Sequence, residues 1–380
     1  QDIIPRGNGR SYGDSSISNK IVITKKLNKI ISYNAQKGLI NVQSGVKIQG
    51  IINLVLGDGW FLNVTPGSKF VTIGGCVASD VHGKNHHNEG SFDKSILSFR
   101  LKLSDNKIIT CSKKKNSQIY KATVGGMGLT GLIIDIKIKL KKIKSSIIKE
   151  STFKTKNLIE TIKLLSNKKF EYSVAWIDAK CKKNYGKGII FFGDHYEKGK
   201  LTKIKNKKKK IYFPSFFLNR ISNKIFNYIY YQFHKRKIRY IDYDEFFYPL
   251  DNISNWNEFY GQKGFFQYQF VVPKKFVKKC LGEILKKVSS SKFICFLATL
   301  KMLGKKNKNY LSFAKEGFTL ALDFKFHNEI FDFFEILDQI VIKYNGRIYL
   351  TKDARLKKKT FYKMDYDIKS FNKARKKFRC

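Results

Sequence analysis

Three glycine-rich segments lie in the first 135 residues of this 380-residue chain, and they constrain its fold more than any other feature. They are RGNGRSYGD (residues 6–14), PGSKFVTIGGCVASDVHGKNHH (66–87) and ATVGGMGLTG (122–131). Glycine has no Cβ, so a backbone rich in it can turn tightly and approach a ligand closely. The first segment also carries two arginines, and its exposed N–H groups can surround a pyrophosphate. Taken alone, this segment fits a plain surface turn equally well.

Two common kinds of ligand site are not favoured by these segments. Tyr12 stands where the dinucleotide-binding fingerprint of a Rossmann fold needs its third glycine, and the surrounding strand–helix unit with its acidic residue is missing. The histidines of the second segment, His82, His86 and His87, suggest a metal site. However, Lys84 lies among them and no acidic residue stands at ligand spacing, so we expect no metal.

Short strands alternate with short helical stretches over the first 140 residues. We predict strands at Ile21–Thr24, Leu39–Gln43 and Gly131–Leu140, a helix at Val46–Leu56, and a hairpin formed by Ile96–Leu103 and Ile108–Cys111. This pattern is α+β and does not consist of regular βαβ units. From about residue 145 glycine becomes rarer, while aromatic residues and lysine become more frequent. We therefore predict one domain at residues 1–142 and a second at 143–346.

The formal net charge of +46 raises the question of a nucleic-acid partner. Lysine is spread along the chain, and the abundance of Lys, Asn, Ile, Phe and Tyr is typical of an AT-rich genome, so we expect no specific nucleic acid.

The chain contains no run of about 18 apolar residues, so we expect no membrane-spanning helix. The first residues do not resemble a signal peptide. The six cysteines form no C-x-x-C pair, so a reducing compartment, the cytoplasm, is expected.

The segment Ile211–Tyr240 mixes aromatic and basic residues in a way that fits two structures. It could be an amphipathic surface lying on the inner face of a membrane, which would make the protein peripheral. It could equally be an ordinary helix packed on the second domain. The pattern alone leaves both open.

The glycine-rich segments, in this order, resemble the FAD domain of flavoproteins of the vanillyl-alcohol-oxidase type. With GRIYLTKDAR (346–355) and FQYQFVVP (266–273), the chain resembles the decaprenylphosphoryl-β-D-ribose oxidase family over nearly its whole length. The resemblance implies an α+β, two-domain PCMH-type FAD-binding fold with an antiparallel-sheet substrate domain. It also implies that a C-terminal segment, residues 347–380, returns to the FAD-binding domain.

The activity that the resemblance implies is FAD-dependent oxidation of a secondary sugar hydroxyl. The expected substrate is a sugar or lipid-linked sugar, such as a polyprenyl-phosphoryl pentose oxidised at its 2'-OH to a ketone. A separate NAD(P)H-dependent reductase would then complete an epimerisation. One alternative is an aldonolactone or alditol oxidase that uses O₂. Another is a flavin-free, basic nucleic-acid or membrane-surface protein that has kept only the fold.

The resemblance assigns FAD contacts to the first two glycine-rich segments and to two isolated residues. They are Arg6, Gly7, Asn8, Gly9, Arg10, Ser11, Tyr12, Gly13, Asp14, Gly67, Thr72, Ile73, Gly74, Gly75, Ser79, Asp80, Val81, His82, Ile133 and Tyr349. Many relatives bond FAD covalently through a histidine of the first loop. Residues 6–14 contain none, so non-covalent FAD is expected.

Lys352 matches a family lysine that is needed for activity. A buried lysine can serve as a base that takes the carbinol proton, or as a cation that stabilises the developing alkoxide. The resemblance places His82, Gln269, Lys301 and Lys84 in the same site, where the two lysines could neutralise a substrate phosphate.

Trp176, Gln267, Thr319 and Ala321 match further positions of the substrate pocket. Gln267 and Gln269 are two residues apart and would face the same side of a strand. Ala321 stands where mycobacterial members have a reactive cysteine, so inhibitors that attack that thiol should fail.

Overall fold

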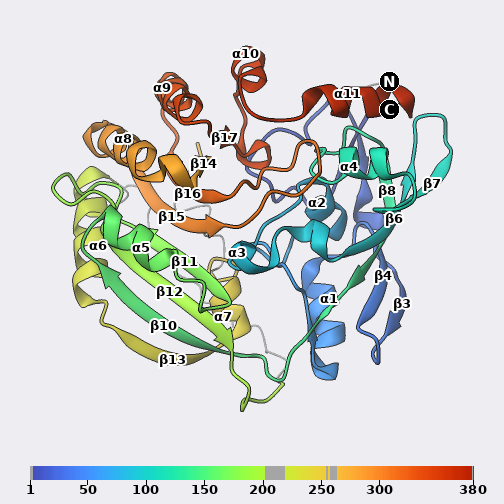
Figure 1. Ribbon diagram of the computed structural model, residues 1–380, viewed down its shortest axis with the longest axis horizontal. Coiled ribbons are helices and arrows are strands. Elements are labelled where there is room, and N and C mark those ends of the chain that lie inside the picture. Colours follow the sequence, from blue (N-terminus) through green and yellow to red (C-terminus); the bar gives the residue numbers. More distant parts are fainter. Residues whose placement is uncertain (1–2, 202–218, 254–255, 257–262, 379) are drawn as a thin grey trace.

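The computed structural model describes residues 3–201, 219–253, 256, 263–378 and 380, and shows two layers of β-structure that face each other (Figure 1). One layer is built from the first 142 residues, and the other is a larger sheet formed by the middle of the chain. Most of Ile211–Tyr240 lies in helix α6 and strand β13, while its residues 211–218 lie outside the described part of the chain.

A five-stranded antiparallel sheet forms the first layer, in the order β3-β4-β8-β6-β7. Its strands are β3 (Ile30–Asn34), β4 (Leu39–Gln43), β6 (Ile96–Lys102), β7 (Ile108–Cys111) and β8 (Leu132–Lys139). The predicted hairpin and the predicted strands at 39–43 and 131–140 are confirmed within one residue at each end. Ile133, Asp135, Ile136 and Ile138 of β8 are buried, and Asp135 forms an ion pair with Arg100 of β6.

Shorter elements complete this layer. They are β1 (Ile3–Arg6), β2 (Lys20–Ile23), β5 (Trp60–Phe61), β9 (Lys141–Lys142), α1 (Ile48–Val55), α2 (Ile73–Ala78), α3 (His86–Glu89) and α4 (Ser117–Thr123). The predicted helix at 46–56 is α1, which buries Ile48, Ile51, Ile52 and Val55 along one face. This apolar stripe packs into the hydrophobic core, as is typical of a surface helix with apolar residues at helical spacing.

An eight-stranded sheet forms the second layer, in the order β13-β10-β12-β11-β15-β16-β14-β17, and every adjacent pair is antiparallel. Its strands are β10 (Ile147–Thr155), β11 (Tyr172–Ile177), β12 (Gly188–His195), β13 (Lys237–Asp242), β14 (Phe265–Pro273), β15 (Cys295–Leu303), β16 (Gly317–Lys325) and β17 (Arg347–Ile348). The antiparallel sheet implied for the substrate domain is therefore present.

Helices cover the side of the large sheet that is turned away from the first layer (Figure 1). The helices on this side are α5 (Leu158–Leu165), α8 (Val277–Ser290) and α9 (Ile330–Lys343). The remaining helices of the second half of the chain lie elsewhere: α6 (Arg220–Phe233), α7 (Tyr243–Phe247), α10 (Lys358–Tyr362) and α11 (Ile368–Lys377). The C-terminal segment starts as β17 on the large sheet, and its α11 then packs against α4 of the first layer. Among the described residues, no helix has the length and apolar character needed to cross a bilayer.

Candidate active site

A cavity of about 920 Å³ separates the two layers. The three glycine-rich segments line it on one side. Strands β14, β15 and β16 and the turn after β17 line it on the other. Its size lies near the upper end of the range of about 300–1,000 Å³ that is common for ligand pockets.

Most residues that were predicted to contact FAD line this cavity. They are Gly7, Asn8, Gly9, Arg10, Ser11, Tyr12, Gly67, Thr72, Gly74, Gly75, Ser79, Val81, His82, Ile133 and Tyr349. Local packing explains one of the glycines, since a Cβ on Gly7 would lie 2.3 Å from Thr72 Oγ1. That hydroxyl also accepts a hydrogen bond from the backbone N–H of Gly75 at 3.3 Å and caps α2.

Five residues predicted to contact FAD do not line the cavity: Arg6, Gly13, Asp14, Ile73 and Asp80. The backbone N–H groups of Gly13 and Asp14 donate to the carbonyls of Thr351 and Asp353, each at 3.3 Å. These two bonds fix the first glycine-rich loop against the turn that carries Lys352, although the two segments are more than 330 residues apart in the chain.

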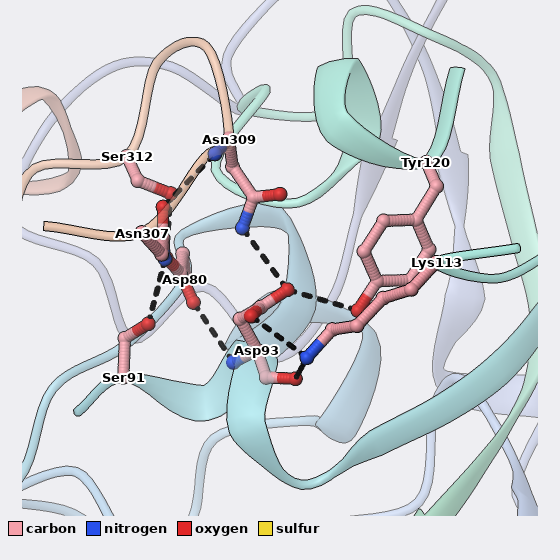
Figure 2. A network of polar contacts seen from close by, with 8 residues as sticks. All are labelled: Asp80, Ser91, Asp93, Lys113, Tyr120, Asn307, Asn309 and Ser312. Atoms are coloured by element: carbon pink, nitrogen blue, oxygen red, sulfur yellow. Dashed lines mark hydrogen bonds and ion pairs between the residues drawn. The ribbon is translucent and has the colours of Figure 1, made fainter. Parts of the chain in front are cut away.

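The Asp80 carboxylate points into a buried polar network (Figure 2). It accepts hydrogen bonds from Ser91 Oγ at 2.9 Å, Asn307 Nδ2 at 2.6 Å and Ser312 Oγ at 2.5 Å. The neighbouring Asp93 accepts from Tyr120 Oη at 2.9 Å. Since Asn307 and Ser312 belong to the β15–β16 loop, this network joins the first layer to the large sheet.

Lys352 is half-buried and lies at the end of the cavity that faces the large sheet. Its Nζ lies 3.7 Å from the centroid of the Tyr12 ring. Burial lowers the pKa of Lys352 to about 8, and the carboxylate of Asp323 opposes this shift. Burial raises the pKa of Asp323 to about 6, while a hydrogen bond from Gln267 Nε2 at 2.6 Å and the charge of Lys352 act in the opposite direction.

Gln269 and His82 meet close to this lysine. Gln269 Nε2 lies 3.2 Å from His82 Nε2 and donates to Thr319 Oγ1 at 3.1 Å. Thr319, which does not line the cavity, thereby orients the Gln269 amide. Burial lowers the pKa of His82 well below its usual range, and the charges of nearby Lys301, His86 and Lys352 add to the effect, so His82 is neutral near pH 7.

Two more predicted lysines reach the cavity but differ in their surroundings. Burial lowers the pKa of Lys301 to about 8, and the charge of Lys352 adds to this shift. Lys84 donates a hydrogen bond to the Phe246 carbonyl, and its Nζ lies 4.2 Å from the centroid of the Phe246 ring. Burial lowers the pKa of Lys84 to about 7, although Glu150 opposes that shift. Cationic groups that gather in one cavity favour an anionic ligand.

The remaining predicted pocket residues, Trp176, Gln267 and Ala321, also line the cavity. Asp323 is a site residue that the sequence analysis missed. It follows Ala321 by two positions on β16, so the period-2 rule that grouped Gln267 with Gln269 could have identified it. Glu150, which forms an ion pair with Arg239 across β10 and β13, was missed as well, because no motif surrounds it.

Several features of the cavity fit a bound FAD. Ser44 Oγ and His82 Nδ1 are buried and have no hydrogen-bond partner among the described residues. A Cβ on Gly67 would meet nothing within 4 Å, so the backbone there borders open space that a flat ligand can occupy. No group of three or more His, Cys, Asp or Glu side chains within the described part of the chain is arranged to hold a metal ion.

Comparisons with known proteins agree with this geometry. The family described as FAD binding domain matches residues 1–112. Decaprenylphosphoryl-beta-D-ribose oxidase of Mycolicibacterium smegmatis is 31% identical over 386 residues, which cover 95% of this chain and 83% of that protein. L-gulonolactone oxidase 3 of Arabidopsis thaliana is 23% identical over 41% of this chain and 28% of its own length.

A solved structure extends the likeness to the whole fold. Physcomitrella patens BBE-like 1 wild-type matches with a TM-score of 0.70 over 99% of this chain and 83% of that one, at 14% identity. Together with the match of the FAD binding domain, this likeness confirms the predicted two-domain α+β fold of the PCMH type.

Proposed function

Because the chain belongs to the decaprenylphosphoryl-β-D-ribose oxidase family, we propose that it oxidises a secondary hydroxyl of a lipid-linked sugar, the 2'-OH of a polyprenyl-phosphoryl pentose, to a ketone. The chain is an FAD-dependent oxidoreductase. The sugar and its lipid are the proposed part. The observation that supports them is a cavity that joins a glycine-rich wall to a cluster of half-buried lysines around Lys352.

The glycine-rich wall would hold FAD without a covalent bond. The backbone of residues 7–12 would surround the pyrophosphate, as exposed N–H groups do in other anion sites. Gly67, Ser79 and His82 would border the rest of the cofactor. Once bound, FAD supplies the acceptor for the two electrons that leave the carbinol carbon as hydride.

Lys352 would accept the proton that the carbinol oxygen loses in the same reaction. A base is most effective when its pKa lies close to the working pH, and burial brings the pKa of Lys352 to about 8. Gln269, held by Thr319 and His82, would orient the sugar hydroxyl toward Lys352 Nζ. Lys301 and Lys84 would neutralise the phosphate that links sugar to lipid.

The ketone product would be the substrate of a separate NAD(P)H-dependent reductase, which would complete an epimerisation. The second candidate, oxidation of an aldonolactone or alditol with O₂, is favoured only by the similarity to L-gulonolactone oxidase 3 over 41% of the chain. Such small neutral substrates would bring no negative charge to Lys84 and Lys301.

Anaerobic absorbance spectroscopy tests the proposal. The FAD-loaded protein is mixed with a short-chain polyprenyl-phosphoryl ribose, a free aldonolactone or an alditol, and the flavin band is followed. We expect bleaching with the phosphoryl ribose alone. Bleaching only with the lactone or alditol would support the second candidate, while an unchanged band with all three would contradict both.

A further inference from the structure

Helix α6 presents apolar side chains to solvent and polar side chains to the protein. Asn223 and Asn227 are buried, and Asn227 Nδ2 donates to Asp178 Oδ1 at 2.9 Å. On the opposite face, Ile225 is 53% exposed and Phe233 is 78% exposed. A helix on the surface of a water-soluble domain normally shows the reverse arrangement. The exposed face of α6 is therefore suited to an apolar neighbour.

The exposed face continues onto β13, the edge strand of the large sheet. The α6–β13 patch consists of the exposed apolar residues Ile221, Ile225, Phe226, Tyr228, Ile229, Phe233, Ile238 and Tyr240. Residues 219–241 also include six basic residues and no Asp or Glu: Arg220, Lys224, Lys235, Arg236, Lys237 and Arg239.

An apolar face rimmed with basic side chains matches the chemistry of an anionic bilayer. Apolar side chains enter the boundary between headgroups and acyl chains, and Lys and Arg contact the lipid phosphates. A second copy of the chain is a poorer match, because it would bring another set of the same positive charges to the interface.

The patch also adjoins one end of the cavity. Tyr230 of α6 and Arg239 of β13 line the cavity. The large sheet contributes mainly apolar side chains at that end: Val174, Trp176, Phe191 and Ile241. The ring of Tyr230 packs edge-on against Trp176, with 5.0 Å between centroids. The cavity therefore extends from the neighbourhood of the patch to Lys352, with a mainly apolar lining at the end near the patch and half-buried lysines further along.

We propose that the α6–β13 patch docks on an anionic bilayer and that the lipid-linked substrate passes from the bilayer into the apolar end of the cavity. The second half of this inference rests on the proposed function, since only a lipid-linked sugar needs such a path. Docking itself does not depend on the chemistry of the site. In Figure 1, α6 and β13 lie at the left side of the molecule, remote from the five-stranded sheet.

Vesicle co-sedimentation of the FAD-loaded full chain tests docking. The vesicles contain phosphatidylcholine alone, or phosphatidylcholine and phosphatidylglycerol in equal parts. We expect binding to the anionic vesicles and about 10-fold or more weaker binding by Ile225→Asp, because an apolar side chain of this size contributes about that factor when it leaves water. Phe233→Asp should behave in the same way.

Ile336→Asp is the matched control. Ile336 is 49% exposed and lies on α9, which like α6 has 14 residues, so it changes the same residue type and charge outside the patch. Failure of the wild type to bind anionic vesicles, or an equal loss in Ile336→Asp, would overturn the proposal. A dimer of the wild type that Ile225→Asp converts to a monomer would overturn it too, in favour of self-association.

A soluble substrate separates docking from catalysis. Ile225→Asp should reduce its flavin with a short-chain phosphoryl ribose at the wild-type rate when no vesicles are present. If the wild type binds anionic vesicles but is not reduced by that compound, the proposed function fails while docking stands. If it is reduced but binds no vesicle, the proposed function stands and docking fails.

Discussion

The residues that surround Lys352 at short range set the pKa of its side chain. Its ammonium lies over the Tyr12 ring at 3.7 Å, and burial lowers its pKa to about 8. Asp323 of β16 raises that pKa, while Lys352 in turn lowers the pKa values of Lys301 and His82. A lysine in this setting loses its proton far more readily than one in water.

Removing the Lys352 side chain should slow flavin reduction strongly and leave FAD binding intact. We expect Lys352→Ala to hold FAD and to reduce it about 10²–10⁴-fold more slowly, the usual contribution of a general base. Stopped-flow reduction at saturating substrate measures the rate. Lys301→Ala is the comparison, and it should weaken substrate binding more than it slows reduction. A wild-type rate in Lys352→Ala would remove this residue from the mechanism.

Asp323→Asn should shift the pH profile of flavin reduction to lower pH. The neutral form of Lys352 accepts the proton, so the rate should rise as pH increases through the Lys352 pKa of about 8. The charge of Asp323 raises the pKa of Lys352. Removing this charge should therefore shift the midpoint of the pH profile to lower pH by about 1 pH unit. The charged or titratable groups around Lys352, namely Tyr12, His82 and Lys301, stay in place.

Gln267→Leu is the control for Asp323→Asn, because it removes the 2.6 Å hydrogen bond to Asp323 without removing the charge. Its profile should keep the midpoint of the wild type. An unchanged midpoint in Asp323→Asn, or a shift to higher pH, would show that Asp323 does not act on Lys352 through its charge.

At the scale of elements, local patterns predict strands well and their partners poorly. Alternation in β8 and helical spacing in α1 depend on neighbouring residues, so both elements could be predicted from the sequence. The bonds from Gly13 and Asp14 to the turn around Lys352 join segments far apart in the chain, and no local pattern contains them. In α6, periodicity separates an apolar face from a polar one but does not say which face is buried.

The Asp80 network is such a long-range link between elements, and its loss should destabilise the protein. Asp80→Ala would leave Ser91, Asn307 and Ser312 without their shared acceptor, at a cost of about 3 kcal/mol in the free energy of unfolding. Asp80 also has a φ of 39°, which alanine tolerates less well than Asp or Asn.

Denaturant unfolding of the apoprotein measures this loss, with Asp80→Asn as control. Asparagine keeps one acceptor oxygen and the tolerance for positive φ, so its loss of stability should be clearly smaller. Equal stability of the alanine and asparagine variants would mean that the network contributes little to joining the β15–β16 loop to the first layer.

At the scale of the whole molecule, the cofactor cavity lies between the two layers, so FAD should act as part of the structure. The glycine-rich segments of the first layer and the strands of the large sheet both line that cavity. A ligand that binds only the folded chain stabilises it in proportion to the logarithm of its free concentration, by about 2.7 kcal/mol at 100 times the dissociation constant.

Removal and return of FAD tests both its role and its mode of binding. Residues 6–14 contain no histidine, so acid precipitation should release the flavin as intact FAD into the supernatant. The apoprotein should then melt at a lower temperature, and its midpoint should rise steadily as FAD is added back. Flavin that stays with the precipitated chain would show a covalent bond elsewhere in the cavity. If the melting temperature does not change when FAD is added, the two layers are held together without the cofactor, by contacts such as the Asp80 network alone.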